Sequence, residues 1–175
     1  MHHFDTIDYL RHGNTEQRQA FTILSVNNVM GILAEFTPVL AGTFPIEVNI
    51  ESSDLDILCC YKSEERFEEV IATSFSGMCN YHLRRIWLDR IPSIIADLTI
   101  DGFEIEIFGQ PIPVFQQNGY RHMIAEHSIL QREGEEFRQE IIRLKRSGYK
   151  TEPAFAHLLG LKGDPYKAIL DYKKT

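Results

Sequence analysis

Ser53-Asp54-Leu55-Asp56-Ile57 opens a predicted strand over residues 54–61 in which acidic and apolar residues alternate. Side chains two positions apart in a strand point to the same face, so Asp54 and Asp56 project together while Leu55 and Ile57 face the core. Two carboxylates at that separation repel each other unless a cation or a proton lies between them. Mg²⁺ prefers oxygen ligands of this kind, together with substrate phosphates. A solvated strand face at a sheet edge is the alternative interpretation.

A second acidic strand follows at Phe103-Glu104-Ile105-Glu106-Ile107-Phe108. Its alternation again places two carboxylates, Glu104 and Glu106, on one face and apolar residues on the other. We favour Glu106 as the partner of the aspartate pair because it is closer to the turn at Gly109, where a strand end opens to solvent. The spacing leaves Glu104 open, and the alternative is that one or both glutamates simply face water.

A glycine turn, Ala41-Gly42-Thr43, stands 12 residues before Asp54, at the end of a short predicted strand over residues 37–41. Glycine lets the backbone turn tightly and approach an anion closely. The hydroxyl of Thr43 and free backbone N–H groups are suited to hold phosphate oxygens. Taken alone, this piece is better explained as a plain strand-ending turn.

The rest of the chain predicts an α+β fold. Asn14 and Gln17 form a capping box that begins a helix running to about residue 35. Asp101-Gly102 is typical of a hairpin turn between two strands. Further predicted strands cover residues 81–88, 93–99 and 103–108, and further helices cover residues 63–75, 115–132, 135–147, 152–159 and a last one from residue 164. We therefore expect a mixed β-sheet with flanking helices in residues 1–110, followed by a small C-terminal helical part in residues 111–175.

Composition limits the function. Of 175 residues, 18 are Lys or Arg and 25 are Asp or Glu, a net charge of −7. Residues 1–110 hold 7 basic and 17 acidic side chains, whereas residues 111–175 hold 11 basic and 8 acidic side chains. This asymmetry suits cation binding by residues 1–110 and phosphate binding by residues 111–175. Ordinary variation between solvated surfaces is the alternative interpretation. Long nucleic acid is not an expected partner of so acidic a molecule. No apolar run approaches the ~18 residues of a membrane span, so we expect no membrane partner and a cytoplasmic location.

Other candidates have plainer explanations. His122 and Glu126 are four residues apart on one predicted helix, which is typical of a surface pair. Lys145 belongs to a small basic cluster that we expect at a solvated helix end, and Trp87 is expected in the core. The odd cysteine count without a CxxC pair predicts reduced thiols.

The glycine turn and the two acidic strands together resemble the pattern of the nucleotidyltransferase superfamily, whose members share the polymerase β-like fold. Further stretches make nearly the whole chain similar to a bacterial family within it that carries a domain-of-unknown-function label: Gly42-Thr43-Phe44-Pro45-Ile46, Glu106-Ile107-Phe108-Gly109-Gln110-Pro111, Gln117-Asn118-Gly119-Tyr120-Arg121-His122-Met123 and Lys150-Thr151-Glu152-Pro153-Ala154-Phe155-Ala156. The resemblance implies that Asp54, Asp56 and Glu106 bind Mg²⁺ or Mn²⁺ and act in catalysis. It implies that Gly42 and Thr43 bind the nucleotide, with Thr43 in place of the commoner serine.

Two functions follow. The first is a metal-dependent nucleotidyltransferase that moves a nucleoside monophosphate from a nucleoside triphosphate to an acceptor, which is a small hydroxylated molecule, a protein side chain or an RNA end. The second is a non-catalytic module of the same fold that binds a protein partner, such as one component of a toxin–antitoxin pair. The presence of all three acids and of the Gly-Thr turn favours the first.

Overall fold

The computed structural model describes residues 4–172, and its centre is a five-stranded mixed sheet in the order β1-β2-β5-β4-β3. The strands are β1 (Val39–Ala41), β2 (Leu55–Cys60), β3 (Cys79–Leu88), β4 (Ile91–Ile100) and β5 (Phe103–Gln110). Strand β2 runs parallel to β5, and the other neighbouring pairs are antiparallel. The predicted mixed sheet is confirmed.

Two tight hairpins connect β3, β4 and β5. The predicted turn at Asp101-Gly102 has positive φ at both central residues, 47° and 86°, and Asp89-Arg90 does the same with 50° and 67°. Positive φ at both positions is the geometry whose twist matches that of paired strands. These turns fix the register in which β4 and β5 bring their polar residues together.

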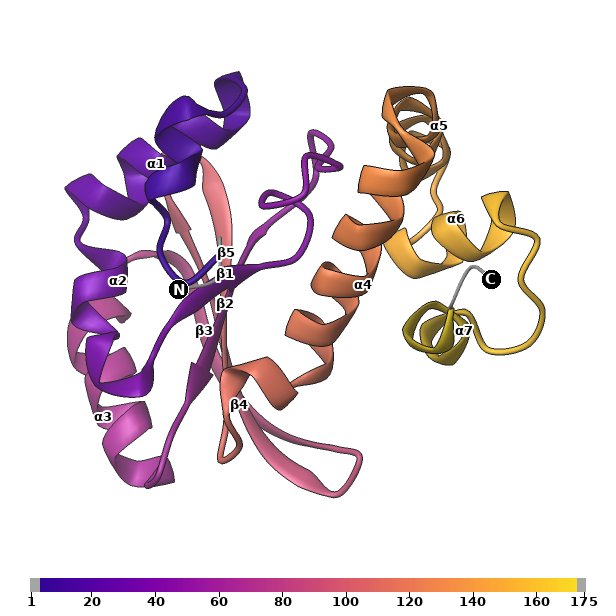
Figure 1. The fold of residues 1–175 in the computed structure, drawn as a ribbon. Helices are drawn as coiled ribbons and strands as arrows, with labels where there is room; N and C mark the ends of the chain where they lie inside the picture. The colour runs from indigo at the N-terminus through magenta and orange to yellow at the C-terminus, as the bar shows by residue number, and fades with distance from the viewer. Residues whose placement is uncertain (1–3, 173–175) are drawn as a thin grey trace.

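The N-terminal helices cover one face of the sheet (Figure 1). They are η1 (Asp8–His12), α1 (Thr15–Val26), α2 (Val29–Ile32), η2 (Ala34–Phe36) and α3 (Glu64–Phe75). The prediction of one helix to residue 35 is wrong, because α1 ends at Val26 and Asn28 has the left-handed φ of 50°. Asparagine tolerates this conformation, and the Asn27 side chain donates a hydrogen bond to the carbonyl of Ile23 at 3.0 Å, which ends the helix.

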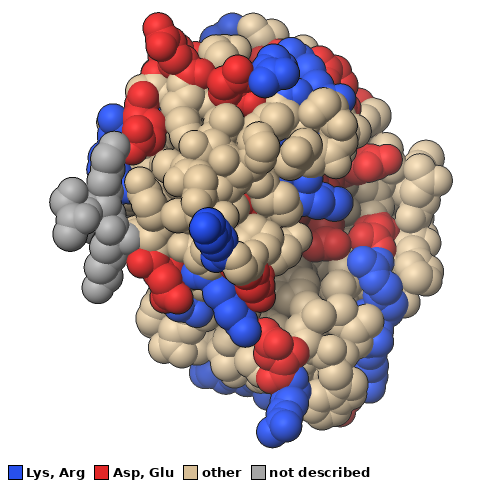
Figure 2. Space-filling model, turned by 90° about the vertical axis from the view of Figure 1, so that its right-hand side faces the viewer, with Lys and Arg blue, Asp and Glu red and all other residues tan. Residues whose placement is uncertain are grey.

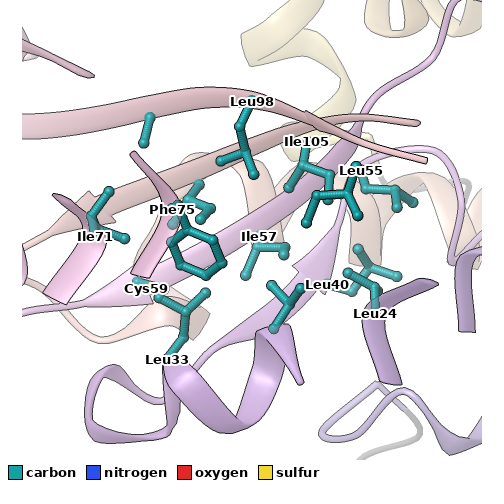
Figure 3. Close-up of a cluster of buried hydrophobic side chains, with 14 of the residues drawn as sticks. Leu24, Leu33, Leu40, Leu55, Ile57, Cys59, Ile71, Phe75, Leu98 and Ile105 are labelled. Atoms are coloured by element: carbon teal, nitrogen blue, oxygen red, sulfur yellow. The ribbon is translucent and has the colours of Figure 1, made fainter. Parts of the chain in front are cut away.

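The first apolar core lies between these helices and the sheet. Leu55 and Ile57 of β2 and Ile105 of β5 belong to this cluster, together with the buried Leu24 of α1 and Phe75 of α3 (Figure 3). These are the apolar positions of the two acidic strands. Their alternation therefore leaves the carboxylates on the opposite face.

The C-terminal helices stand against that opposite face (Figure 1). They are η3 (Val114–Gln116), α4 (Asn118–Glu133), α5 (Glu135–Arg146), α6 (Thr151–Leu158) and α7 (Pro165–Asp171). A second core joins Met123 of α4 and Ile141 of α5 to Val48 and Leu58, which belong to residues 1–110. The division into residues 1–110 and a separate C-terminal part from residue 111 stays a prediction. Side chains from both sides of that boundary contribute to this core.

The single tryptophan is not in the core. Trp87 is 74% exposed, so the sequence prediction for it is wrong. It lies near the tip of β3, which is the last strand in the sheet order and has a neighbour on one side only. None of the helices within residues 4–172 has the length and apolar character needed to cross a membrane.

Candidate active site

Carboxylates from three neighbouring strands meet in register on the face opposite the first core. Asp56 of β2 pairs with Glu106 of β5, and Glu106 pairs with Asp97 of β4. Directly paired residues on adjacent strands share a face and lie close together. Asp54 stands immediately before β2, two residues from Asp56. Glu104 pairs instead with a threonine and is exposed.

Two carboxylates of this row are half-buried and are repelled by their neighbours. Burial, followed by repulsion from Asp54 and Glu106, raises the pKa of Asp56 to about 8, and Lys145 offsets part of that effect. Burial and repulsion from Asp54 also raise the pKa of Glu106, against the pull of Arg84. Burial and a nearby like charge both disfavour the ionised form of a carboxylate.

Gly42 makes room for Asp56. Its φ is +69°, and a Cβ atom built on it would stand 1.8 Å from Oδ2 of Asp56. A side chain at this position is therefore excluded by both the backbone conformation and the space. Thr43 follows in the same turn, and its carbonyl accepts a hydrogen bond from the N–H of Val48 at 3.1 Å.

The loop between β1 and β2 is fastened to helices on both sides. The Gln17 amide of α1 donates to the Phe44 carbonyl at 2.9 Å. From α5, Lys145 donates to the Val48 carbonyl at 2.8 Å, and Arg146 forms an ion pair with Glu51 at 2.7 Å. The turn at residues 42–43 is thus held in place beside the acidic strands.

Sequence reasoning missed Arg84 and Asp97. The Arg84 guanidinium binds the Asp97 carboxylate and lies 3.5 Å from Oε2 of Glu106. Asp97 interrupts the apolar run Ile94-Ile95-Ala96 before Leu98, and a lone aspartate within an apolar strand is a weaker signal than the paired acids of the other two strands. Arg84 carries no comparable signal, because one arginine in an edge strand is ordinary.

A second polar cluster lies on the C-terminal helices. His122 Nδ1 is 2.9 Å from Oε1 of Glu152, and the ring of Tyr166 stacks on His122 with centroids 5.9 Å apart. Glu126 is 3% exposed and Lys145 is 7% exposed. The predictions of a surface pair on α4 and of a solvated Lys145 are therefore wrong, because α4 packs against α5 and α7.

The buried charges of this cluster perturb one another. Burial, with repulsion from Glu152, raises the pKa of Glu126 well above its usual range, although Lys145 opposes the shift. Burial lowers the pKa of Lys145 to about 8 despite the surrounding carboxylates of Glu126, Asp56 and others. Strongly perturbed groups that gather in a cleft are typical of functional sites.

Both clusters line one cleft of about 1000 Å³. Its sheet side includes Gly42, Thr43, Asp54, Asp56 and Glu106, and its helix side includes His122, Glu126, Lys145, Glu152 and Tyr166. All five site residues predicted from the sequence therefore open onto the same space. Within residues 4–172, no three His, Cys, Asp or Glu side chains are grouped closely enough to hold a metal ion. The donor set, carboxylate oxygens short of a counter-charge, nevertheless suits a hard cation.

Comparison with known proteins identifies the family. A sequence profile of the family described as "Domain of unknown function (DUF4269)" matches residues 22–172. The chain belongs to this family. A search of curated proteins gave no match.

Solved structures similar to this member of the family show its fold. The Cid1 poly(U) polymerase with Mg 3′-dATP bound is 13% identical with a TM-score of 0.54, and the match covers 90% of this chain and 48% of that one. The polymerase core of TRAMP, an RNA surveillance complex, is 13% identical with a TM-score of 0.52, covering 90% and 49%. The GLD-2/RNP-8 complex is 11% identical with a TM-score of 0.52, covering 87% and 60%. The chain spans about half the length of these structures and has the nucleotidyltransferase fold, as predicted.

Proposed function

We propose that the chain is a metal-dependent nucleotidyltransferase, which moves a nucleoside monophosphate from a nucleoside triphosphate to an acceptor. One observation carries the proposal: Asp56 and Glu106 pair in register on neighbouring strands and face the cleft beside Gly42. The nucleotidyltransferase fold supports it, since one solved structure of this fold has Mg 3′-dATP bound.

Asp54, Asp56 and Glu106 would hold Mg²⁺ or Mn²⁺. When bound, such an ion neutralises phosphate charge and activates the attacking group. Side-chain movements must bring the three carboxylates together, and Glu106 must accept the metal ion in addition to Arg84 or in place of it. Gly42 and Thr43 would bind the β- and γ-phosphates through backbone N–H groups and the threonine hydroxyl.

The acceptor attacks in line. Its oxygen forms a bond to the α-phosphorus, and the bond from that phosphorus to the oxygen bridging the β-phosphate breaks. Pyrophosphate leaves with the electron pair of the broken bond. The acceptor's proton passes to one carboxylate of the cluster formed by Asp54, Asp56 and Glu106.

The test is transfer of label from an α-³²P nucleoside triphosphate together with release of pyrophosphate. We expect the double variant D54N/D56N to lose both activities while it keeps its fold, because its amides replace the charged ligands without a change in size. The matched control is E104Q, which removes a carboxylate exposed at the far end of β5 and should leave both activities unchanged. Undiminished transfer by the double variant contradicts the proposed site.

The second candidate, a non-catalytic module that binds a protein partner, is favoured by the position of Arg84. Its guanidinium already supplies positive charge to Asp97 and Glu106. A module of this kind binds Mg²⁺ and ATP no more tightly than the double variant does. Calorimetric titration of Mg²⁺ with ATP into the wild-type protein separates the two functions, because only the transferase should give saturable binding heat and a higher melting temperature.

A further inference from the structure

The helix side of the cleft carries a buried carboxylate with an unpaired oxygen atom. Glu126 is 3% exposed, lines the cleft, and its Oε1 atom has no hydrogen-bond partner among the residues that the structure describes. An unpaired buried carboxylate is costly for the folded protein. A hydrogen-bond donor brought by a ligand would offset this cost.

The charged neighbours of Glu126 do not supply that donor. Lys145 donates to the Val48 carbonyl at 2.8 Å, and it forms no ion pair within 4.0 Å in the described part of the chain. Glu152 contributes a second carboxylate to this wall, and the bond at 2.9 Å to His122 holds it there. This wall thus carries the buried carboxylate of Glu126 and the half-buried carboxylate of Glu152, with the ammonium group of Lys145 and the imidazole of His122 beside them.

We propose that Glu126, assisted by Glu152, binds the ammonium group of a small acceptor whose hydroxyl group receives the nucleotide. This inference rests on the proposed function and names the class of its acceptor. In the transfer, the acceptor's hydroxyl oxygen bonds to the α-phosphorus, pyrophosphate leaves, and the hydroxyl proton goes to the acidic cluster on the sheet. The ammonium group itself keeps its protons and is not altered.

The charge of the cleft argues against an RNA acceptor. The lining side chains include Asp54, Asp56, Asp89, Glu106, Glu126, Glu152 and Asp164, against Lys145, Lys150 and Lys167. Figure 2 shows acidic and basic side chains interspersed over the face on the side of the C-terminal helices, with no continuous basic track in that view. Binding of a polynucleotide depends on a series of lysine and arginine contacts to phosphates.

The experiment compares acceptors that differ in one group. Wild-type protein with Mg²⁺ and α-³²P ATP is incubated with ethanolamine and glucosamine, with their hydroxyl counterparts ethylene glycol and glucose, and with a uridine hexanucleotide. We expect labelling of an amine-bearing probe above its counterpart and above the RNA. For that probe E126Q should raise KM by roughly ten- to hundredfold, the range expected on losing a hydrogen bond to a charged group.

The remaining readouts separate binding from folding. KM for ATP should stay unchanged in E126Q, and its melting temperature should be equal to that of the wild type or higher, because the substitution removes a buried charge. E126D should recover part of the lost affinity, and E136Q, at an exposed site on α5 outside the cleft, should behave as wild type. Equal labelling of amine and hydroxyl probes, labelling of RNA, or no labelled probe while Mg²⁺ and ATP still bind would each overturn the acceptor class alone. Absence of Mg²⁺ and ATP binding would overturn the proposed function instead.

Discussion

Replacement of Asp56 by asparagine should stabilise the metal-free protein at neutral and alkaline pH. Burial and repulsion raise the pKa of Asp56 from 3.8 to about 8, so the folded state keeps a proton that the unfolded chain has released. The stability associated with that proton is fully present below pH 3.8 and is lost as the pH rises towards 8. A shift of that size corresponds to roughly 6 kcal/mol. Because the amide of asparagine must also be buried at this position, we expect the substitution to recover about 1–3 kcal/mol of it.

The assay is urea and thermal unfolding of the wild type and D56N in EDTA, between about pH 5 and pH 8, the window set by this shift. The stability advantage of D56N should grow across this range, with roughly 2–4 °C in melting temperature for each kcal/mol. Buried Glu126 contributes the same sign of pH dependence to both proteins, so the difference between them isolates Asp56. A D56N protein that is less stable than the wild type at the upper pH, or a difference that does not change with pH, would refute the reasoning.

Two further substitutions test the geometry. E106Q should abolish metal-dependent nucleotide transfer and leave the melting temperature equal or higher, whereas E104Q should retain transfer; an inactive E104Q would reverse the assignment of the third acid. G42A should lose about 2–4 kcal/mol of stability, because alanine disfavours positive φ and its Cβ meets the Asp56 carboxylate. The matched control G77A, whose Cβ would meet nothing within 4 Å, should change stability by about 1 kcal/mol or less in the same urea titration.

The two acidic strands could be predicted from the sequence because side chains in a strand alternate between its two faces with a period of two residues. Alternation of carboxylates with Leu55 and Ile57 is enough to assign one face to the core and the other to the carboxylates. It was not enough to choose between Glu104 and Glu106, which share a face. That choice depends on the parallel pairing of β2 with β5, a contact between segments about fifty residues apart. Asp97 is the only carboxylate of its strand, so no pair of acids marked that strand in the sequence.

The helix side of the cleft was not accessible in this way. A pair at positions i and i+4, such as His122 and Glu126, has the same spacing whether its helix face meets water or other helices. Its burial depends on the packing of α4 against α5 and α7, which local sequence does not contain. The prediction that Trp87 is buried was wrong because it rested on aromatic character alone. Its strand, β3, lies at the edge of the sheet.

Lys145 joins the two sides of the cleft into one site. Its ammonium group reaches from α5 to the carbonyl of Val48, in the loop that follows the Gly42 turn. Its charge acts on Asp56 of the sheet and on Glu126 of α4, and burial makes that charge costly to keep. A cation bound by the sheet carboxylates or an ammonium group bound by Glu126 would each remove part of what stabilises the charged form of Lys145. Occupation of the two sides is therefore electrostatically linked through this one residue, although the chain order places them in different parts.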